Sequence, residues 1–448
     1  MKPRIVYFAG AEGRRVERFG QWKRRCCMWT VFRMIAVVLA LLGAAAPCLA
    51  AGGAGKAAVI EPLHRGIGIP GWFTWTRKEM SNGKFVRYAP DPFLARSVLW
   101  AEDMQYLKSS GIDFVRLGVD PGPFIEANPA TRRAYFARIG ATIRQFNAAG
   151  LAVVWDYHPE GKGAYYSYED LFVSGGRFAP AFDQLVSETA SYLKAFSEKS
   201  VYFEIINEPP MGCHRDMRSA EEPIMRIYNA ARRANDRLYI VVEGDCYASI
   251  DGLIKLKPAN FAGADRVIWS FHFYEPAQFS QQGEKGHDAT LSNIGLMPYG
   301  DATRPKSVIL QTFHKNIEGA PITILERTVR EAAFAHSLDN YYAKIPNRAG
   351  VQSRISQVND WARENHIPAG NILLGEFGVC KFVDGRGADP TDRARWIRDV
   401  REVTESFGFS WAFWEYFDPS GHMSIMESPT SRVMDRNVAA ALGLSPGK

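Results

Sequence analysis

From about residue 60 onward, short runs of apolar residues alternate with longer segments whose apolar positions recur at helical spacing. The short runs predict buried strands, and the longer segments predict amphipathic helices that cover them. Regular alternation of the two is typical of parallel strand-helix units. Strands are predicted at residues 66–69, 113–119, 151–157, 201–207, 238–243, 267–274, 372–377 and 409–416.

Helices are predicted in the intervals between these strands. Gly111 and Gly150 close the first two helices, where glycine commonly caps a C-terminus. Eight strands with helices between them, and no second compositional regime, predict a single α/β domain with the fold of a (β/α)8 TIM barrel. The predicted helices cover residues 95–110, 131–149, 180–199, 221–235, 327–344, 352–365 and 391–406.

One interval, between the predicted strands 6 and 7, is much longer than the others. It spans residues 275–371, of which 277–321 are predicted to be mostly irregular. Long loops in compact domains are usually functional. We therefore expect this insertion to lie beside the mouth of the active site and to shape it.

The positive charge of the chain is concentrated at its N-terminus. The formal net charge is +6, and residues 1–50 contain nine Lys or Arg against two Glu, a balance of +7. The rest of the chain is therefore close to −1, by subtraction of the two balances. This distribution argues against a nucleic-acid partner, because a folded nucleic-acid-binding surface would itself be basic.

The same terminal segment predicts export. Basic residues continue to Arg33, residues 34–46 are apolar, and Pro47-Cys-Leu-Ala50 has the small residues of a cleavage site. We expect a signal peptide at residues 1–50, a mature domain at residues 51–448, and a secreted protein, periplasmic or extracellular. An uncleaved anchor is the alternative, although the apolar stretch is shorter than the roughly 20 residues of a membrane span. No stable membrane association is expected after cleavage.

Three cysteines remain after the predicted cleavage. Cys213 and Cys246 follow two successive strands and could bridge neighbouring loops, whereas Cys380 stands alone. Disulfides are common in exported proteins. Three unpaired buried thiols are the alternative.

Two glutamates end predicted strands, Glu208 in Asn207-Glu208-Pro209 and Glu376 in Gly375-Glu376-Phe-Gly378. The active site of such a barrel lies at the carboxyl ends of its strands. Two carboxylates on one face are what glycoside hydrolysis requires. Because Pro209 disfavours helical angles in the residue before it, we expect extended backbone at Glu208.

Further polar and aromatic residues occupy the other strand ends. Singly, each could be a packed core residue, but together with the two glutamates they form a specific set. The set comprises Arg116 in Phe-Val-Arg-Leu, His158 in Trp-Asp-Tyr-His, Asn207, His272 and Tyr274 in His-Phe-Tyr, and Trp414.

This set resembles glycoside hydrolase family 5, the cellulase-like family of retaining β-glycosidases, over essentially residues 60–445. The resemblance implies that Glu208 is the acid/base and Glu376 the nucleophile, held ionised by Arg116 and Tyr274. It implies that Asn207 binds a sugar 2-hydroxyl. It also implies that His158 and His272 orient sugar and carboxylates, that Trp414 stacks under the sugar, and that the Trp414–Glu415 peptide is cis.

The expected substrate is a β-linked polysaccharide or oligosaccharide, cleaved by a monomeric endo-β-1,4-glucanase. A mannanase, a xyloglucanase or an exo-β-glucosidase is an alternative within the family, and a non-catalytic carbohydrate-binding protein is an alternative outside it. No cofactor or metal is expected, because no His/Cys/Asp cluster has zinc-ligand spacing.

Other residues near the strand ends are predicted to support the site. Asp156, Glu160, Glu243, Glu275 and Glu415 are expected to act behind the catalytic residues or to contact substrate. Two aromatic groups are either sugar-stacking platforms or loop packing. These are Trp72, Phe73 and Trp75 after strand 1, and Tyr165, Tyr166 and Tyr168 after strand 3.

Overall fold

The computed structural model describes residues 63–93, 101–160, 165–213, 219–284, 289–300, 304–417, 422–428 and 431–446. All of them belong to one compact unit, Lys56–Lys448. The predicted signal segment, together with residues 95–100 of the first predicted helix, lies outside the described residues. None of the described helices has both the length and the apolar character needed to cross a membrane.

Eight parallel strands close into a barrel in the order β1, β10, β9, β8, β7, β6, β5, β4. This confirms the predicted (β/α)8 barrel and each of the predicted strands. The strands β6, β8 and β10 end earlier than predicted, at Glu204, His272 and Phe413. The barrel strands are β1 (Arg65–Phe73), β4 (Phe114–Val119), β5 (Ala152–Tyr157), β6 (Val201–Glu204), β7 (Ile240–Glu243), β8 (Val267–His272), β9 (Ile372–Phe377) and β10 (Ser410–Phe413).

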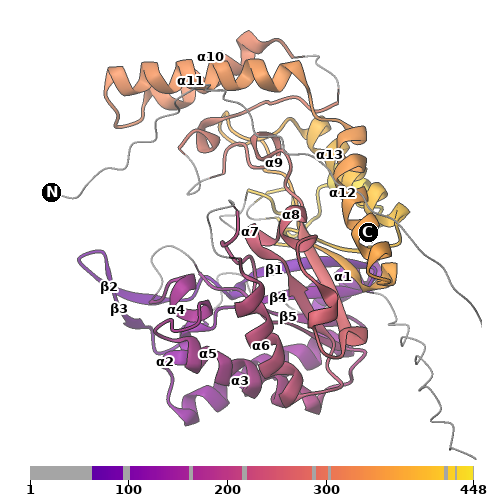
Figure 1. The fold of residues 1–448 in the computed structure, drawn as a ribbon. Helices are drawn as coiled ribbons and strands as arrows, with labels where there is room; N and C mark the ends of the chain where they lie inside the picture. The colour runs from indigo at the N-terminus through magenta and orange to yellow at the C-terminus, as the bar shows by residue number, and fades with distance from the viewer. Residues whose placement is uncertain are drawn as a thin grey trace, which may run out of the picture. The chain divides into compact units, whose positions relative to one another are not determined.

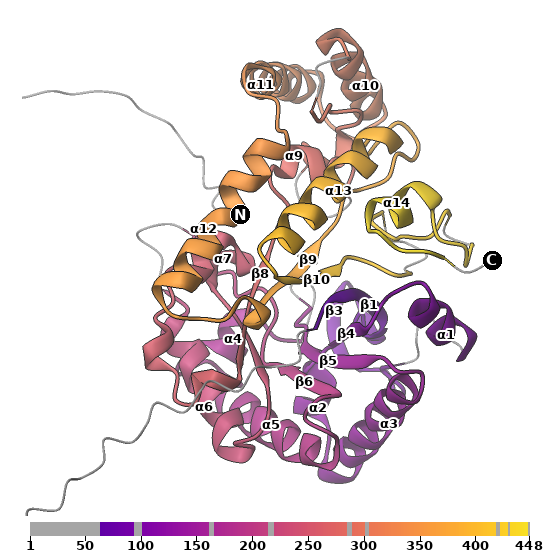
Figure 2. The ribbon, with the colours of Figure 1, turned by 90° about the vertical axis from the view of Figure 1, so that its right-hand side faces the viewer.

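Helices connect the strands and cover the barrel (Figure 1). In both views α10 and α11 lie side by side, with α9 and α13 between them and the strands (Figure 2). The helices are α1 (Ala101–Ser109), α2 (Gly122–Glu126), α3 (Pro129–Ala148), α4 (Tyr168–Phe172), α5 (Ala179–Tyr192), α6 (Glu221–Ala234), α7 (Asp245–Ala248), α8 (Ile250–Leu253), α9 (Ala277–Ser280), α10 (Lys306–Glu318), α11 (Ile324–Ala343), α12 (Arg348–Glu364), α13 (Pro390–Ser406) and α14 (Arg436–Ala441).

Several short elements and one longer helix depart from the sequence-based expectation. The prediction that residues 277–321 are mostly irregular is wrong for α10, which buries Ile309, Phe313 and Ile317 at helical spacing. A hairpin of β2 (Lys78–Ser81) and β3 (Lys84–Tyr88) was not predicted either. Its turn, Asn82-Gly83, has positive φ at both residues and is a recognised hairpin signal.

The barrel interior changes from apolar to polar along the strands. Phe114 and Val241 belong to the apolar cluster near the amino ends. Arg116 and Glu243 follow two residues later on the same strands, so their side chains also point inward, and both are buried. Alternation along the strands therefore places a buried charged layer directly beneath the carboxyl ends.

Candidate active site

The structure brings the eight predicted site residues together at the carboxyl ends of the barrel strands. Each of them contacts at least one other member of the set, as the distances below show. They are Arg116 within β4, His158 after β5, Asn207 and Glu208 after β6, His272 and Tyr274 at and after the end of β8, Glu376 near the end of β9, and Trp414 after β10.

Glu376 is buried and bound at both carboxylate oxygens. Arg116 Nη1 donates to Oε1 at 2.5 Å, and the Tyr274 hydroxyl donates to Oε2 at 2.8 Å. Burial opposes its ionisation, but the charges of His272, Arg116 and His158 outweigh burial and lower the pKa of Glu376. The side chain is therefore an anion with a fixed orientation.

Arg116 organises the charged layer below Glu376. Its guanidinium binds Glu204 through Nε at 2.7 Å and Nη2 at 2.8 Å, and Nη2 also donates to Asn207 Oδ1 at 2.6 Å. Asp156 Oδ2 lies 3.2 Å from Nη2. Burial opposes the charge, but the surrounding carboxylates raise the pKa of Arg116. The fork geometry of guanidinium suits this many carboxylate contacts, which a lysine ammonium could not reproduce.

The backbone at Glu208 differs from the expectation. The residue has a φ of +47°, so the predicted extended conformation is wrong. Pro209 restricts right-handed helical angles but does not enforce extension. The Glu208 N–H donates to Glu243 Oε2 at 2.6 Å, and this contact accompanies the left-handed conformation.

The Glu208 carboxyl group faces His272 and retains partial exposure, with 28% of its side chain accessible. His272 Nδ1 lies 2.8 Å from Glu208 Oε1 and 3.6 Å from Glu376 Oε2. Burial, reinforced by the negative charge of Glu376, raises the pKa of Glu208 even though His272 opposes the shift. The pKa values of the two carboxyl groups therefore differ, so that Glu208 is favoured as the acid and Glu376 as the anion.

His158 and Trp414 form a second side of the site. Their rings stack with centroids 5.5 Å apart and an interplanar angle of 7°. His158 Nδ1 lies 2.8 Å from Asp156 Oδ2. Burial opposes protonation of His158, but Asp156 outweighs it and raises the pKa of His158. The Trp414–Glu415 peptide is cis, as predicted.

Sequence reasoning missed Glu204, whereas Glu243 lies behind the catalytic residues, as expected. Glu204 binds Arg116, and Glu243 binds the backbone of Glu208. The Tyr168 hydroxyl donates to the Asn207 carbonyl oxygen at 2.9 Å. A glutamate at an inward position of an otherwise apolar strand was the available signal for Glu204, because a buried carboxylate requires a partner.

Half of the six candidate stacking aromatics are buried in the packed interior. Trp72, Phe73 and Tyr166 are buried, which supports loop packing for these three. Trp75 lies edge-on to His158 with centroids 5.8 Å apart, so it borders the site. Tyr165 packs with centroids 4.9 Å from Phe178.

The insertion begins directly after Tyr274, is tied together near that start, and contacts the segment that follows β9. Arg354 of α12 donates to both carboxylate oxygens of Glu275 at 2.7 Å, directly after Tyr274. Asn316 of α10 donates to the Gly385 carbonyl oxygen at 2.8 Å. The insertion is thus tied to segments that hold the site.

Cys213 and Cys246 form a disulfide, whereas Cys380 is a free, buried thiol. The disulfide joins the loop after Glu208 to the turn after β7. Cys26, Cys27 and Cys48 lie outside the described residues.

Among the residues that the structure describes, two groups have ligand atoms within 4.8 Å of one another, a spacing that could hold a metal ion. They are Glu204, Glu243 and His272, and Glu208, His272 and Glu376. Both depend on His272, whose two ring nitrogens already face carboxylate oxygens at 2.8 and 2.7 Å. Arg116 adds a buried positive charge. The contacts therefore fit a set of mutually balanced charges better than a metal centre.

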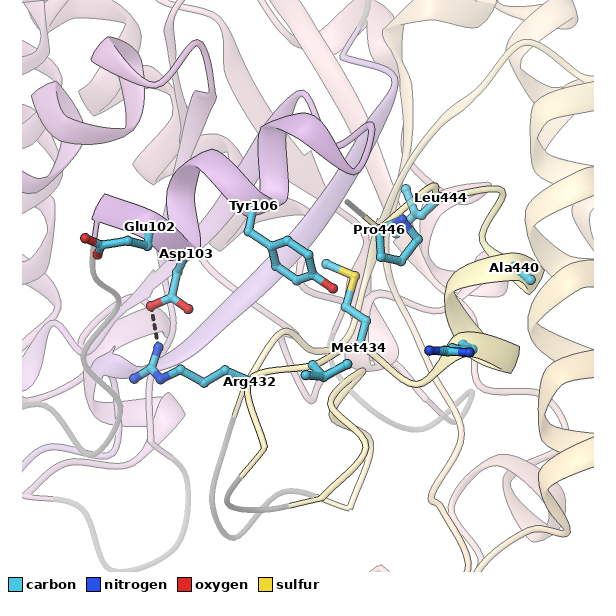
Figure 3. Close-up of a pocket in the computed structure, with 10 residues that line it drawn as sticks. Glu102, Asp103, Tyr106, Arg432, Met434, Ala440, Leu444 and Pro446 are labelled. Atoms are coloured by element: carbon cyan, nitrogen blue, oxygen red, sulfur yellow. Dashed lines mark hydrogen bonds and ion pairs between the residues drawn. The ribbon is translucent and has the colours of Figure 1, made fainter. Parts of the chain in front are cut away.

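A separate groove lies between α1 and the C-terminal segment, with a volume of about 1160 Å³. Figure 3 shows Tyr106 of α1 on one side, Met434 and Leu444 on the other, and the ion pair between Asp103 and Arg432. None of the candidate site residues lines this groove.

Comparison with known proteins agrees with the geometry. A family model described as Cellulase (glycosyl hydrolase family 5) matches residues 91–419, a range that contains all eight candidate residues. Endoglucanase 3 of Fibrobacter succinogenes is 23% identical over 380 residues, with 82% of this chain and 51% of that protein covered. The chain therefore spans about half the length of this curated relative.

Solved structures show the same fold. Endoglucanase Cel5A from Thermotoga maritima has a TM-score of 0.60 at 20% identity, with 85% of this chain and 97% of that chain covered. A family 5 xyloglucanase from Paenibacillus pabuli has a TM-score of 0.59 at 14% identity, with 86% and 99% covered. From the family match over most of its length and the assembled strand-end residues, the chain belongs to glycosyl hydrolase family 5, a family of glycoside hydrolases.

Proposed function

We propose that this protein hydrolyses β-glycosidic bonds with retention of configuration, with Glu208 as acid/base and Glu376 as nucleophile. The spacing of the two carboxyl groups carries the proposal. One oxygen of each lies within 4.8 Å of the other. Retaining enzymes hold their carboxyl groups about 5–5.5 Å apart, whereas inverting enzymes need roughly 6.5–9.5 Å to admit a water molecule.

The electrostatics supports these two roles. In the first step the Glu376 anion attacks the anomeric carbon while Glu208 donates its proton to the leaving oxygen, which forms a glycosyl ester and a free alcohol. The ester removes the negative charge that helps to raise the pKa of Glu208. Glu208 can then accept a proton from the water that cleaves the ester and regenerates Glu376.

Within this reaction, the other predicted residues take positioning roles. Arg116 and Tyr274 bind the two oxygens of Glu376. Asn207 is fixed by Arg116 and is proposed to contact the sugar 2-hydroxyl. Trp414, backed by His158, is proposed to stack under the sugar ring at the cleavage point.

The proposed substrate is a β-1,4-glucan cut within the chain. The match to a protein named Endoglucanase 3 supports it. A solved endoglucanase neighbour has been crystallised with cellobiose and with mannotriose, and another neighbour is a xyloglucanase, so mannan and xyloglucan remain the alternatives. An exo-acting β-glucosidase is the further alternative.

Product analysis tests the proposal. Residues 51–448 would be incubated with carboxymethylcellulose, barley β-glucan, mannan and xyloglucan, and the anomeric configuration of new ends would be followed by NMR. We expect β-configured oligosaccharides of mixed length from a glucan. Glu208→Gln and Glu376→Gln should each lose on the order of 10³-fold or more in turnover. Inverted products, or an active Glu376→Gln variant, would remove the assigned mechanism, and binding without cleavage would favour a carbohydrate-binding protein.

Export to an oxidising compartment is also proposed. The disulfide between Cys213 and Cys246 supports it, because such bonds persist mainly outside the cytosol. N-terminal sequencing of protein recovered from the periplasm or the medium would test cleavage after Ala50, and a mature protein that begins at Met1 would contradict it. A monomer remains the expected state, to be measured by sedimentation.

A further inference from the structure

We propose that Glu243 is a positioning residue for acid catalysis, because its one carboxylate holds both the backbone and the imidazole partner of Glu208. The inference rests on the proposed function of Glu208 as acid/base. Glu243 is 2% exposed and its side chain is fully buried, so it acts through Glu208 and not on the substrate.

The first contact fixes the backbone. Glu243 Oε2 accepts the N–H of Glu208 at 2.6 Å. Glu208 has a φ of +47°, a backbone conformation that residues other than glycine seldom adopt and that persists where surrounding contacts enforce it. The adjoining loops are joined at two more points, since Cys246 N donates to the Met211 carbonyl oxygen at 2.6 Å and Tyr247 N donates to that of Pro209 at 3.0 Å.

The second contact fixes the side chain. Glu243 Oε1 lies 2.7 Å from His272 Nε2, and the opposite ring nitrogen, Nδ1, lies 2.8 Å from Glu208 Oε1. The contact with Glu243 is an ion pair without hydrogen-bond geometry. Carboxylates on both sides of the ring, together with the raised pKa of His272, favour the imidazolium, which carries a proton on each nitrogen. An imidazolium that donates to Oε1 leaves Oε2 of Glu208 to carry the transferable proton.

The charges around Glu243 maintain this arrangement. It faces Arg116 of β4 at 3.8 Å, Glu204 of β6 and His272 of β8. Burial would raise the pKa of Glu243, but the nearby charge of His272 outweighs it and lowers the pKa to about 2. Burial likewise opposes protonation of His272, yet the charges of Glu243 and Glu376 raise its pKa well above the usual value.

Glu243→Gln tests the inference, because it preserves shape and removes the charge opposite His272. A misplaced acid lowers the cleavage rate of substrates whose leaving group must be protonated, and it has little effect on substrates whose leaving group departs without a proton. We expect kcat/KM on a cello-oligosaccharide to fall at least ~100-fold, and kcat/KM on 2,4-dinitrophenyl β-cellobioside to fall less than about 10-fold. Azide, which attacks the glycosyl ester without a base, should restore turnover of the activated substrate and yield a β-glycosyl azide.

Two matched variants separate this role from a loss of folding. Glu405→Gln removes a partly buried glutamate that pairs with Arg65 and Arg401 at the amino end of the barrel, and it should leave the leaving-group dependence unchanged. In Glu208→Gln, kcat/KM should depend on the leaving group more steeply than in Glu243→Gln, because the acid itself is removed. If Glu208→Gln retains the wild-type dependence, the proposed function itself fails.

The inference on Glu243 is overturned if Glu243→Gln keeps wild-type kinetics or loses activity equally on both substrates without azide rescue. Should Glu243→Gln not fold, as judged by circular dichroism, Glu243→Asp replaces it, since that variant keeps the charge but withdraws the carboxylate by one methylene. A steeper leaving-group dependence in Glu243→Asp supports the inference, and wild-type kinetics in that variant overturns it.

Discussion

Removal of the disulfide between Cys213 and Cys246 offers a test whose magnitude follows from the chain itself. The two residues are 33 apart in sequence. In the chain-entropy description, closing a loop of this length lowers the entropy of the unfolded chain by about 12–13 cal/mol/K, or roughly 3.7 kcal/mol at 25 °C. Both cysteines are only partly buried, so serine is tolerated at each position. The double variant Cys213→Ser/Cys246→Ser should therefore lose about 3–4 kcal/mol of unfolding free energy.

Urea unfolding followed by tryptophan fluorescence would measure this loss, with the slope m compared between variants to detect a change in the unfolded state. Wild-type protein treated with a reductant should unfold like the double variant. Cys380→Ala is the matched control, because it removes a free thiol and leaves the disulfide intact. An oxidised wild type and a double variant that unfold within about 0.5 kcal/mol of each other would refute the loop-closure reasoning.

Three further outcomes are expected. Tyr274→Phe removes the 2.8 Å hydrogen bond to Glu376 and should cost about 1.5–3 kcal/mol in kcat/KM. Because that bond favours the Glu376 anion, the acid limb of the pH-rate profile should move to higher pH. An unmoved acid limb would contradict the contact. The pH-rate profile of the wild type should be bell-shaped, since activity falls as pH drops through the lowered pKa of Glu376 and as pH rises through the raised pKa of Glu208. Glu208→Gln should lose the basic limb in assays with activated aryl substrates. A retained basic limb would mean that a group other than Glu208 causes it. Gly68→Ala places a methyl group 2.7 Å from Trp414 Cε3 and should raise KM by displacing that ring. The control Gly319→Ala adds a methyl group that meets nothing within 4 Å and should leave KM unchanged. Equal KM values for the two variants in steady-state kinetics would count against the packing argument.

The strand pattern and the catalytic pair were readable from sequence because each depends on local chemistry. A buried strand must be apolar over several residues, and its end is marked by Pro or Gly. That rule located every barrel strand and placed Glu208 and Glu376 at strand ends. The helix α10 and the hairpin β2–β3 also carry local signals, in the spacing of Ile309, Phe313 and Ile317 and in the Asn82-Gly83 turn.

Other features depend on which segments meet in space, and no local pattern encodes that. The left-handed backbone of Glu208 is supported by a carboxylate 35 residues further along the chain. The sequence does not decide between a disulfide joining Cys213 and Cys246 and two free thiols, because spacing alone excludes neither; the structure shows the disulfide. The protonation of His272 depends on Glu243 and Glu376, which come from two different strands. The sequence thus determined the strands and the chemical groups, whereas barrel closure decided their distances, and with them the pKa shifts, because electrostatic interactions depend on separation and burial.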